Sequence, residues 1–232
     1  MNASFYTAAR GAMTQQEKMN IISNNLANTN TVGFKSKSAA FSDLMHCAMH
    51  DIEDTTHGTG IKIERTNTNF TESGITAAGE GGYNYAIEGD GFFMLQDQVT
   101  GELSYTRAGN FSVSIKGEET YLINDNRKYV LDENRNPIQL VNGELTARPA
   151  VFRFINTNDM QSAGFSEFTP VEKNGEPELA EDVRVVENYL EMSNVDLAKE
   201  LSDMIITSRA YSYALKMVQT SDEVQQTINS LR

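Results

Sequence analysis

The two ends of the chain share one seven-residue spacing, and this feature constrains the fold more than any other. In the first segment the spaced positions are apolar except for one glutamine, and steps of four and three residues connect Met1, Phe5, Ala8, Ala12, Gln15, Met19, Ile22 and Leu26. In the last segment the same steps connect Leu197, Leu201, Met204, Ser208, Tyr211, Leu215 and Val218, before the stripe shifts to Val224, Ile228 and Leu231. This spacing is typical of a coiled-coil seam. The chain is therefore predicted to begin and end in helices that pack against other helices.

Turn and cap residues predict where these helices end. Residues 28–31 read Asn-Thr-Asn-Thr and favour turns, and Gly33 supplies a further turn before Phe34. Ser193 and Asn194 offer a cap for the last helix, with Asp196 in its first turn. Two alanines and a glutamine make the first seam too weak to hold a helix alone in water. Pairing inside one chain remains an alternative, but such small residues favour packing among many copies.

The middle of the chain reads as β-structure. Apolar and polar residues alternate in residues 61–65, 111–115 and 151–155, residues 121–123 form a further strand, and glycine- and asparagine-rich turns separate these segments. Residues 47–60 are polar and read as an extended connector. The predicted fold class is α+β, with N- and C-terminal coiled-coil helices packed together, an extended connector and a central β-rich domain. The predicted parts are 1–34, 35–80, 81–188 and 189–232.

Composition excludes several classes of protein. The net charge of −13 argues against a nucleic-acid partner, because a phosphate backbone requires a basic surface. The charge is concentrated in residues 47–189, which carry eleven basic and twenty-four acidic groups, whereas the two ends are nearly neutral. No apolar stretch is long enough to span a membrane, and the N-terminus lacks the pattern of a cleavable secretion signal. The lone Cys47 excludes an internal disulfide framework.

One cluster could hold a metal ion. All three histidines and the cysteine lie within twelve residues, accompanied by two aspartates: His46, Cys47, His50, Asp51, Asp54 and His57. On a helix, His46 and His50 would share one face, a spacing that can chelate zinc, nickel or copper. The alternative is a polar linker, and the sequence favours it because it offers no remote histidine or cysteine ligand and no His-Glu-x-x-His pattern. We expect no metal site and no cofactor.

The search for catalytic residues yields no candidate. Residues 132–136 resemble the start of a calcium loop, but Pro137 and Gly143 stand where that loop requires glycine and glutamate. A β-turn is the preferred interpretation. The glycine pairs at 58/60 and 89/91 lack the strand-then-helix setting of a nucleotide loop. No nucleophile elbow or Walker lysine is present. We therefore expect a protein that is not an enzyme.

Four passages, in order along nearly the whole chain, resemble one known family. Residues 23–35 contain Asn-Asn-Leu-Ala-Asn followed by Gly-Phe-Lys, and residues 189–196 read Tyr-Leu-Glu-Met-Ser-Asn-Val-Asp, followed by Arg-Ala-Tyr at 209–211. Between them lie Ile-Glu-Gly-Asp-Gly-Phe-Phe at 87–93 and Tyr-Thr-Arg-Ala-Gly-Asn-Phe at 105–111. These passages resemble the flagellar rod and hook proteins. Ala108 and Ser208 depart from the family pattern, which often has an acidic residue and a glutamine there.

The resemblance implies a structural subunit of the bacterial flagellar rod that assembles through its terminal helices into the torque-transmitting axial tube. A hook-type subunit is the main alternative; a metal-binding module and an adhesin or effector that uses the helical ends only for export are weaker ones. The length favours a large rod subunit. The implied partners are copies of itself, other axial rod and hook subunits, and the flagellar export apparatus. The implied location is the extracytoplasmic basal body, reached without a cleavable signal.

The sequence also suggests an assembly interface. Asparagine amides can fix the register of a coiled coil, and Gly33 allows Phe34 to bury against the β-domain or a neighbour. Arg209 and Tyr211 can reach across to carbonyls or carboxylates. The candidate interface residues are Asn24, Asn25, Leu26, Ala27, Asn28, Gly33, Phe34, Leu197, Leu201, Met204, Arg209 and Tyr211.

Overall fold

The computed structural model describes residues 3–44, 46–48, 56–58, 60–70, 74–77, 82–141 and 143–231, which fold into two compact units. The helical unit comprises the described residues of Met1–Ala27, Lys37–Asn67 and Asp196–Arg232. The β-unit comprises those of Asn28–Ser36 and Thr68–Val195. The predicted α+β class, with terminal helices and a central β-rich region, is confirmed.

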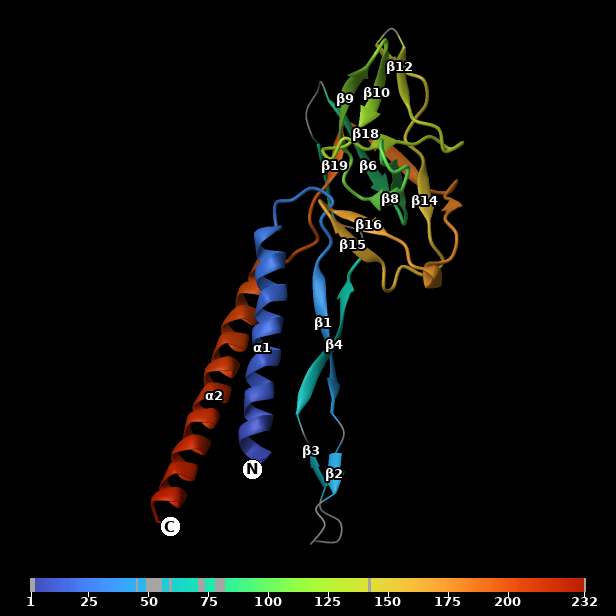
Figure 1. Ribbon diagram of the computed structural model, residues 1–232. Helices are drawn as coiled ribbons and strands as arrows, with labels where there is room; N and C mark the ends of the chain where they lie inside the picture. The colour runs from blue at the N-terminus through green and yellow to red at the C-terminus, as the bar shows by residue number, and fades with distance from the viewer. Residues whose placement is uncertain are drawn as a thin grey trace. The chain divides into compact units, whose positions relative to one another are not determined.

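Two helices dominate the helical unit and run antiparallel to each other, α1 (Ala3–Ala27) and α2 (Leu197–Ser230) (Figure 1). Helix α1 ends directly before the Asn-Thr-Asn-Thr run, as predicted. The predicted cap of the last helix is wrong by two residues, because Asp196 is itself the N-cap: its carboxylate accepts hydrogen bonds from the amides of Ala198 and Lys199. Among the described residues, neither helix has the length and apolarity that a membrane span requires.

A β-ribbon lies along α1. Strand β1 (Lys37–Asp43) pairs with β4 (Ile61–Thr68), and β2 (His46–Ala48) pairs with β3 (Thr56–Gly58) (Figure 1). The hydroxyl of Thr14 on α1 donates to the Ile61 carbonyl at 3.1 Å, which fastens the ribbon to the helix. The helical arrangement considered for His46 is wrong, because His46 lies in β2 opposite Gly58.

The β-unit is built on a long antiparallel sheet. Along its main path the strands pair in the order β15, β16, β8, β7, β11, β10, β9, β6, β18; β12 joins β10 to β13, and β14 joins β7 to β17. A separate pair is formed by β5 (Ile75–Ala77) and β19 (Tyr189–Glu191). The bounds of the others are β6 (Tyr83–Glu88), β7 (Phe92–Gln96), β8 (Leu103–Thr106), β9 (Asn110–Lys116), β10 (Glu119–Ile123), β11 (Tyr129–Val130), β12 (Gln139–Val141), β13 (Glu144–Leu145), β14 (Val151–Arg153), β15 (Gln161–Gly164), β16 (Glu167–Thr169), β17 (Glu178–Leu179) and β18 (Arg184–Glu187), with a 3-10 helix at Glu172–Asn174.

The predicted strands at 61–65, 111–115 and 121–123 are confirmed as parts of β4, β9 and β10, and that at 151–155 corresponds to the shorter β14. The calcium-like stretch at 132–136 is a turn, as preferred. In it the Asp132 carboxylate accepts hydrogen bonds from the amides of Asn134 and Asn136.

Strand β7 is central to the core because both of its faces are buried. Successive side chains of a strand point to opposite faces. Phe93 and Leu95 therefore join one apolar cluster, with Tyr85, Phe111 and Leu122, whereas Phe92 and Met94 join a second cluster around Tyr105, Phe154 and Phe168. The run at residues 92–95 therefore connects the two apolar clusters of the β-unit.

A buried carboxylate supports the second cluster from its edge. Glu167 on β16 is almost fully buried and accepts hydrogen bonds from Ser104, Asn124, Asn126 and Lys128. Burial by itself would raise the pKa of Glu167, but the hydrogen bonds from Lys128, Asn126 and Asn124 outweigh it and lower that pKa below its usual value. The carboxylate is therefore held ionised.

Candidate functional site

The face of α2 that is covered within the chain is lined mainly by small and polar residues. Its buried or half-buried positions follow steps of four and three residues through Glu200, Met204, Thr207, Tyr211, Ala214, Val218 and Ser221, with Asp203 and Ala210 at its border. Only Thr207 and Ser221 are buried, and neither is a large apolar residue. The predicted seam has the same spacing as this face, and three of its seven residues lie on it. Met204, Tyr211 and Val218 belong to the covered face, whereas Leu197, Leu201, Ser208 and Leu215 are exposed.

Most of the exposed large apolar residues of α2 lie in two stripes. The Leu201 stripe consists of Leu197, Leu201 and Leu215, and the Ile206 stripe consists of Ile206, Tyr213, Met217, Val224 and Ile228. At 3.6 residues per turn, these stripes flank the covered face on either side. Exposed fractions run from 39% at Leu215 to 64% at Tyr213. Contiguous exposed apolar residues of this kind mark surfaces that bind other proteins. Within the described helical unit, α2 is covered on one side only.

Helix α1 is better covered than α2. Ala12 and Ile22 of its predicted seam are buried, the other described seam residues are half-buried, and Met1 lies outside the described residues. On its ribbon side, the Asn25 amide nitrogen donates to the Lys37 carbonyl and to the Glu200 carboxylate of α2 at 2.8 and 2.9 Å, while its oxygen accepts from the Lys37 amide. Asn25 thus connects α1, α2 and the ribbon within one chain.

The other candidate interface residues fall into two groups. Asn24, Ala27, Leu197, Leu201 and Arg209 are exposed, and Leu26, Asn28, Met204 and Tyr211 are half-buried, so these remain accessible to a partner. Gly33 and Phe34 are instead buried inside the β-unit. The expectation that Gly33 turns the chain and lets Phe34 bury is met, since Gly33 has a φ of 65° and Phe34 is 8% exposed.

A buried ion cluster lies where the first and last passages of the β-unit meet. The Lys35 ammonium is 2.7 Å from one carboxylate oxygen of Glu191, and the Arg107 guanidinium is 3.3 Å from the other. All three side chains are at most 1% exposed. We call Lys35, Arg107 and Glu191 the clasp. Lys35 lies in the segment by which the chain enters the β-unit, and Glu191 lies near the point at which the chain leaves it. The clasp therefore holds these two chain crossings together at one place.

Backbone contacts reinforce the clasp. The Gly33 amide donates to the Glu191 carbonyl at 2.8 Å, and the Ser36 amide donates to the Asn194 side chain at 2.7 Å. Asn194 donates in turn to the Asn69 carbonyl. At Gly33 a Cβ atom would stand 2.3 Å from the Ala108 amide nitrogen, so only glycine allows this approach.

The clasp was not predicted from the sequence, although a signal for it is present there. Lys35, Arg107 and Glu191 each lie in a different one of the passages that resemble the rod and hook proteins, at residues 23–35, 105–111 and 189–196. A lysine, an arginine and a glutamate in otherwise apolar or amide-rich passages are rarely buried without partners. The spacing along the chain could not show that they meet.

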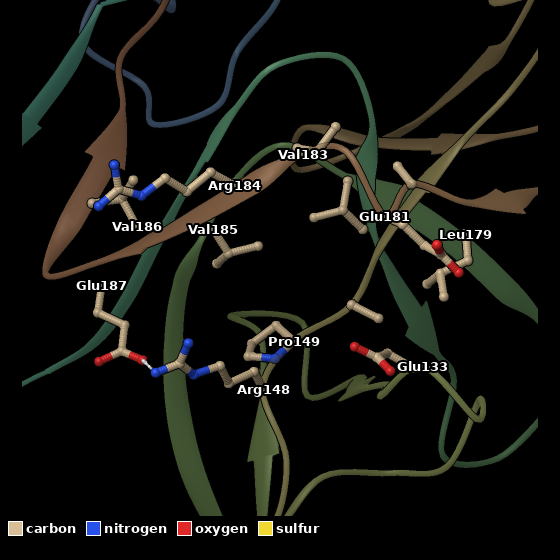
Figure 2. A pocket seen from close by; sticks show the side chains of 13 residues that line it. Glu133, Arg148, Pro149, Leu179, Glu181, Val183, Arg184, Val185, Val186 and Glu187 are labelled. Atoms are coloured by element: carbon tan, nitrogen blue, oxygen red, sulfur yellow. Dashed lines mark ion pairs between the residues drawn. The ribbon is translucent and has the colours of Figure 1, made fainter.

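No arrangement suited to catalysis or metal binding appears among the described residues. No group of three or more His, Cys, Asp or Glu side chains in the described part of the chain is placed to hold a metal ion. His50, Asp51 and Asp54 of the predicted cluster lie outside the described residues. A surface groove of about 760 Å³ lies in the β-unit between β18 and residues 148–151 (Figure 2). Its walls combine valines with charged residues and hold no nucleophile–base pair.

Comparison with known proteins identifies relatives over the whole chain. Residues 5–35 match the flagella basal body rod protein family, residues 86–147 match the flagellar hook protein FlgE/F/G D1 domain, and residues 186–231 match the flagellar basal body rod FlgEFG protein C-terminal domain. The flagellar basal-body rod protein FlgG of Borreliella burgdorferi is 31% identical, covering 100% of this chain and 99% of its own. That of Buchnera aphidicola (subspecies Acyrthosiphon pisum) is 29% identical over 100% of both, and the Rhizobium meliloti rod protein FlgF is 27% identical over 96% and 94%.

Proposed function

The chain belongs to the flagellar basal-body rod and hook protein family and is a structural rod subunit, and from this premise we propose that it assembles with its own kind by burying the two exposed stripes of α2. Each stripe would pack against a helix of a neighbouring copy, so that every α2 is covered on all sides by coiled-coil contacts. The covered face within the chain supplies one contact, and the Leu201 and Ile206 stripes supply the other two.

The observation that supports this proposal is the distribution of side chains around α2. The intrachain face holds Thr207, Ala214 and Ser221, whereas leucines and isoleucines are left outside. Burying one large apolar side chain stabilises a contact by about 1.5–3 kcal/mol. While these leucines and isoleucines stay exposed, the folded monomer does not gain this free energy of burial. Contact with a neighbouring copy would gain it. Several such residues in every copy suffice to hold a polymer together.

The proposed interface follows from this distribution. It comprises the exposed and half-buried candidates Asn24, Leu26, Ala27, Asn28, Leu197, Leu201, Met204, Arg209 and Tyr211, extended by the Ile206 stripe. We assign Asn25, Gly33 and Phe34 a supporting role instead. Asn25 is buried between α1, α2 and the ribbon, and Gly33 and Phe34 are buried in the β-unit. These residues would set the shape of the subunit and not touch a neighbour.

The clasp suits a subunit that must carry torque. Buried ion pairs contribute little net stability but fix geometry when their partners are held. The segments that lead out of α1 and into α2 both pass through the clasp, so force applied to the β-unit would reach the helices through two crossings held together. We propose that Lys35, Arg107 and Glu191 keep these crossings from separating under load.

The remaining functional assignments extend the same proposal. The partners are other copies and other axial rod and hook subunits, with the distal rod as the first choice of position and the second large rod subunit as the alternative. Delivery would use the flagellar export apparatus. The protein would act by structure alone, without catalysis.

Substitutions on one exposed stripe test the proposal. Leu201→Asp places a charge in the Leu201 stripe. The Leu201 side chain is 44% exposed in the single chain. The monomer should therefore keep its fold, whereas assembly should be lost because each neighbour would have to bury a carboxylate. Sedimentation of purified full-length protein at rising concentration measures polymer, and circular dichroism checks the fold.

Val99→Asp is the matched control, since Val99 is an exposed apolar residue in a turn of the β-unit. It adds the same charge outside the helices and should leave polymer formation unchanged. A Leu201→Asp protein that polymerises as readily as the unmodified chain would show that this stripe is not an assembly surface.

A further inference from the structure

An exposed aromatic residue stands on a strained turn of the β-unit. The two-residue turn between β15 and β16 consists of Phe165 and Ser166, with φ values of 49° and 59°. Such left-handed conformations suit glycine and asparagine, and a bulky residue there is an outlier. Of the six described non-glycine residues with positive φ, Phe165 is the only apolar one. Its side chain is nevertheless 78% exposed.

Folding of the chain gives no reason for a phenylalanine at this position. Phe165 belongs to neither apolar cluster of the β-unit, and its side chain is mostly in solvent. Asparagine or glycine would form the same turn with less strain. Strain that persists at an exposed position is a feature of functional surfaces. Aromatic residues, phenylalanine among them, are also enriched at protein interfaces.

The same unit carries a groove that fits an aromatic anchor. Figure 2 shows Val185 of β18 and Val183, which directly precedes that strand, on one side of the groove and Pro149 on the other. Val183 and Val185 also pack against the first apolar cluster, so the floor of the groove is the edge of the core. The wall is formed by β18, the last strand on the sheet path, and the Arg148–Glu187 ion pair of 3.3 Å crosses one end.

Charge favours this turn as the point where two copies meet. The β-unit segments Asn28–Ser36 and Thr68–Val195 carry ten basic and twenty-one acidic residues, so the β-units of two copies repel each other. Residues 160–166 carry no charge, whereas the groove is lined by charged residues of both signs, Arg148 and Arg184 with Glu133, Glu181 and Glu187. An uncharged turn can therefore enter the groove without adding repulsion.

The turn also adjoins the part of the chain that leads to the helices. The Ser166 hydroxyl lies 3.5 Å from the carbonyl oxygen of Val32, a few residues after the end of α1. Phe165 thus lies beside the segment of the β-unit that follows α1 in the chain.

We propose that the β15–β16 turn of one copy inserts Phe165 into the groove between β18 and residues 148–151 of a neighbouring copy. This inference rests on the proposed assembly of the chain. The contact joins two different surfaces of identical subunits, and such head-to-tail contacts generate open helical polymers. It would hold the β-units together in addition to the helices.

Phe165→Asn tests the anchor. Asparagine tolerates the left-handed turn, so the melting temperature of the monomer should stay the same or rise. The critical concentration for polymerisation, measured by sedimentation of the full chain, should rise about tenfold. Val99→Asn makes a comparable exchange at another exposed turn and should leave the critical concentration unchanged. A destabilised monomer would show that Phe165 serves folding, and an unchanged critical concentration would show that it anchors nothing; either result overturns the inference.

Cross-linking tests the partner surface. In a Cys47→Ala background, Phe165→Cys protein is mixed with Val183→Cys protein under assembly conditions and mild oxidation. A covalent dimer should form in this mixture and should be absent when Val99→Cys replaces Phe165→Cys. If polymers formed without this cross-link, the groove would not be the surface that binds Phe165 of a neighbouring copy. If Leu201→Asp blocks polymerisation while Phe165→Asn does not, only this inference fails; if Leu201→Asp has no effect, the proposed helical assembly fails.

Discussion

Lys35 and Glu191, separated by 156 positions in the sequence, form an ion pair of 2.7 Å between Nζ and Oε1 that is closed to solvent. Arg107 contacts the second oxygen of the same carboxylate. Lys35 lies in the segment that follows α1, and Glu191 is the last residue of β19, shortly before α2. The pair therefore closes the β-unit at the place where the chain enters and leaves it.

Glu191→Ala should destabilise the β-unit strongly. Removing one partner of a buried ion pair leaves uncompensated buried charges and costs about 3–5 kcal/mol. Here two cations, Lys35 and Arg107, would lose the same carboxylate. Urea denaturation followed by the fluorescence of the tyrosines would measure the change in unfolding free energy.

Asp182→Ala provides the control for that substitution. It removes an ion pair with Arg153 at 3.3 Å whose side chains are both largely exposed, and exposed pairs contribute about 0–1 kcal/mol. If both substitutions lowered the unfolding free energy by the same small amount, the clasp would not be a stabilising element of the native state.

Gly33→Ala should be far more damaging than Gly117→Ala. Both glycines have a positive φ, 65° and 70°, so both substitutions introduce backbone strain of about 1 kcal/mol. At Gly33 the new Cβ would also stand 2.3 Å from the Ala108 amide, whereas at Gly117 nothing lies within 4 Å. Thermal unfolding of the two variants measures the difference. Equal melting temperatures would mean that residue 33 does not lie against Ala108.

Acid should weaken the β-unit partly through Glu167. Its pKa is lowered in the folded chain, so the unfolded chain, with a pKa of about 4.3, binds the proton more readily. The stabilisation is therefore present above about pH 5 and is lost as the pH falls through the lowered pKa. Urea midpoints between pH 7 and pH 3 should fall more steeply for the unmodified chain than for Glu167→Gln. If the urea midpoints of the two proteins fell equally with pH, the Glu167 carboxylate would not be a source of the acid sensitivity.

Local patterns predicted the elements of the fold because they depend on neighbouring residues. The end of α1 before residues 28–31 and strands β4, β9 and β10 follow from turn chemistry and alternation. The N-cap was misplaced because Ser193, Asn194 and Asp196 are all good caps, and only the folded chain shows that Asn194 bonds to Ser36 instead. The four-part division at residues 34, 80 and 188 stays a prediction.

The candidate site was predicted less completely, for a physical reason. A seven-residue spacing fixes the period of a helix face but not which of two adjacent stripes meets the partner. Leu201 and Leu215 were assigned to the seam by their spacing, but Thr207 and Ala214 occupy the face that is covered within the chain. The larger residues are free for a role outside the chain. The clasp depends on contacts between distant passages, which no local pattern reveals.

Hydrogen exchange of full-length protein, compared between dilute monomer and assembled polymer, tests most directly whether assembly buries α2. In the monomer, amides in residues 197–230 and 3–27 should exchange quickly, whereas those in residues 85–155 should be protected by the core of the β-unit. In the polymer, protection of residues 197–230 should rise by orders of magnitude while residues 85–155 change little. Equal protection of α2 in monomer and polymer would contradict the claim that its exposed stripes are the assembly surface.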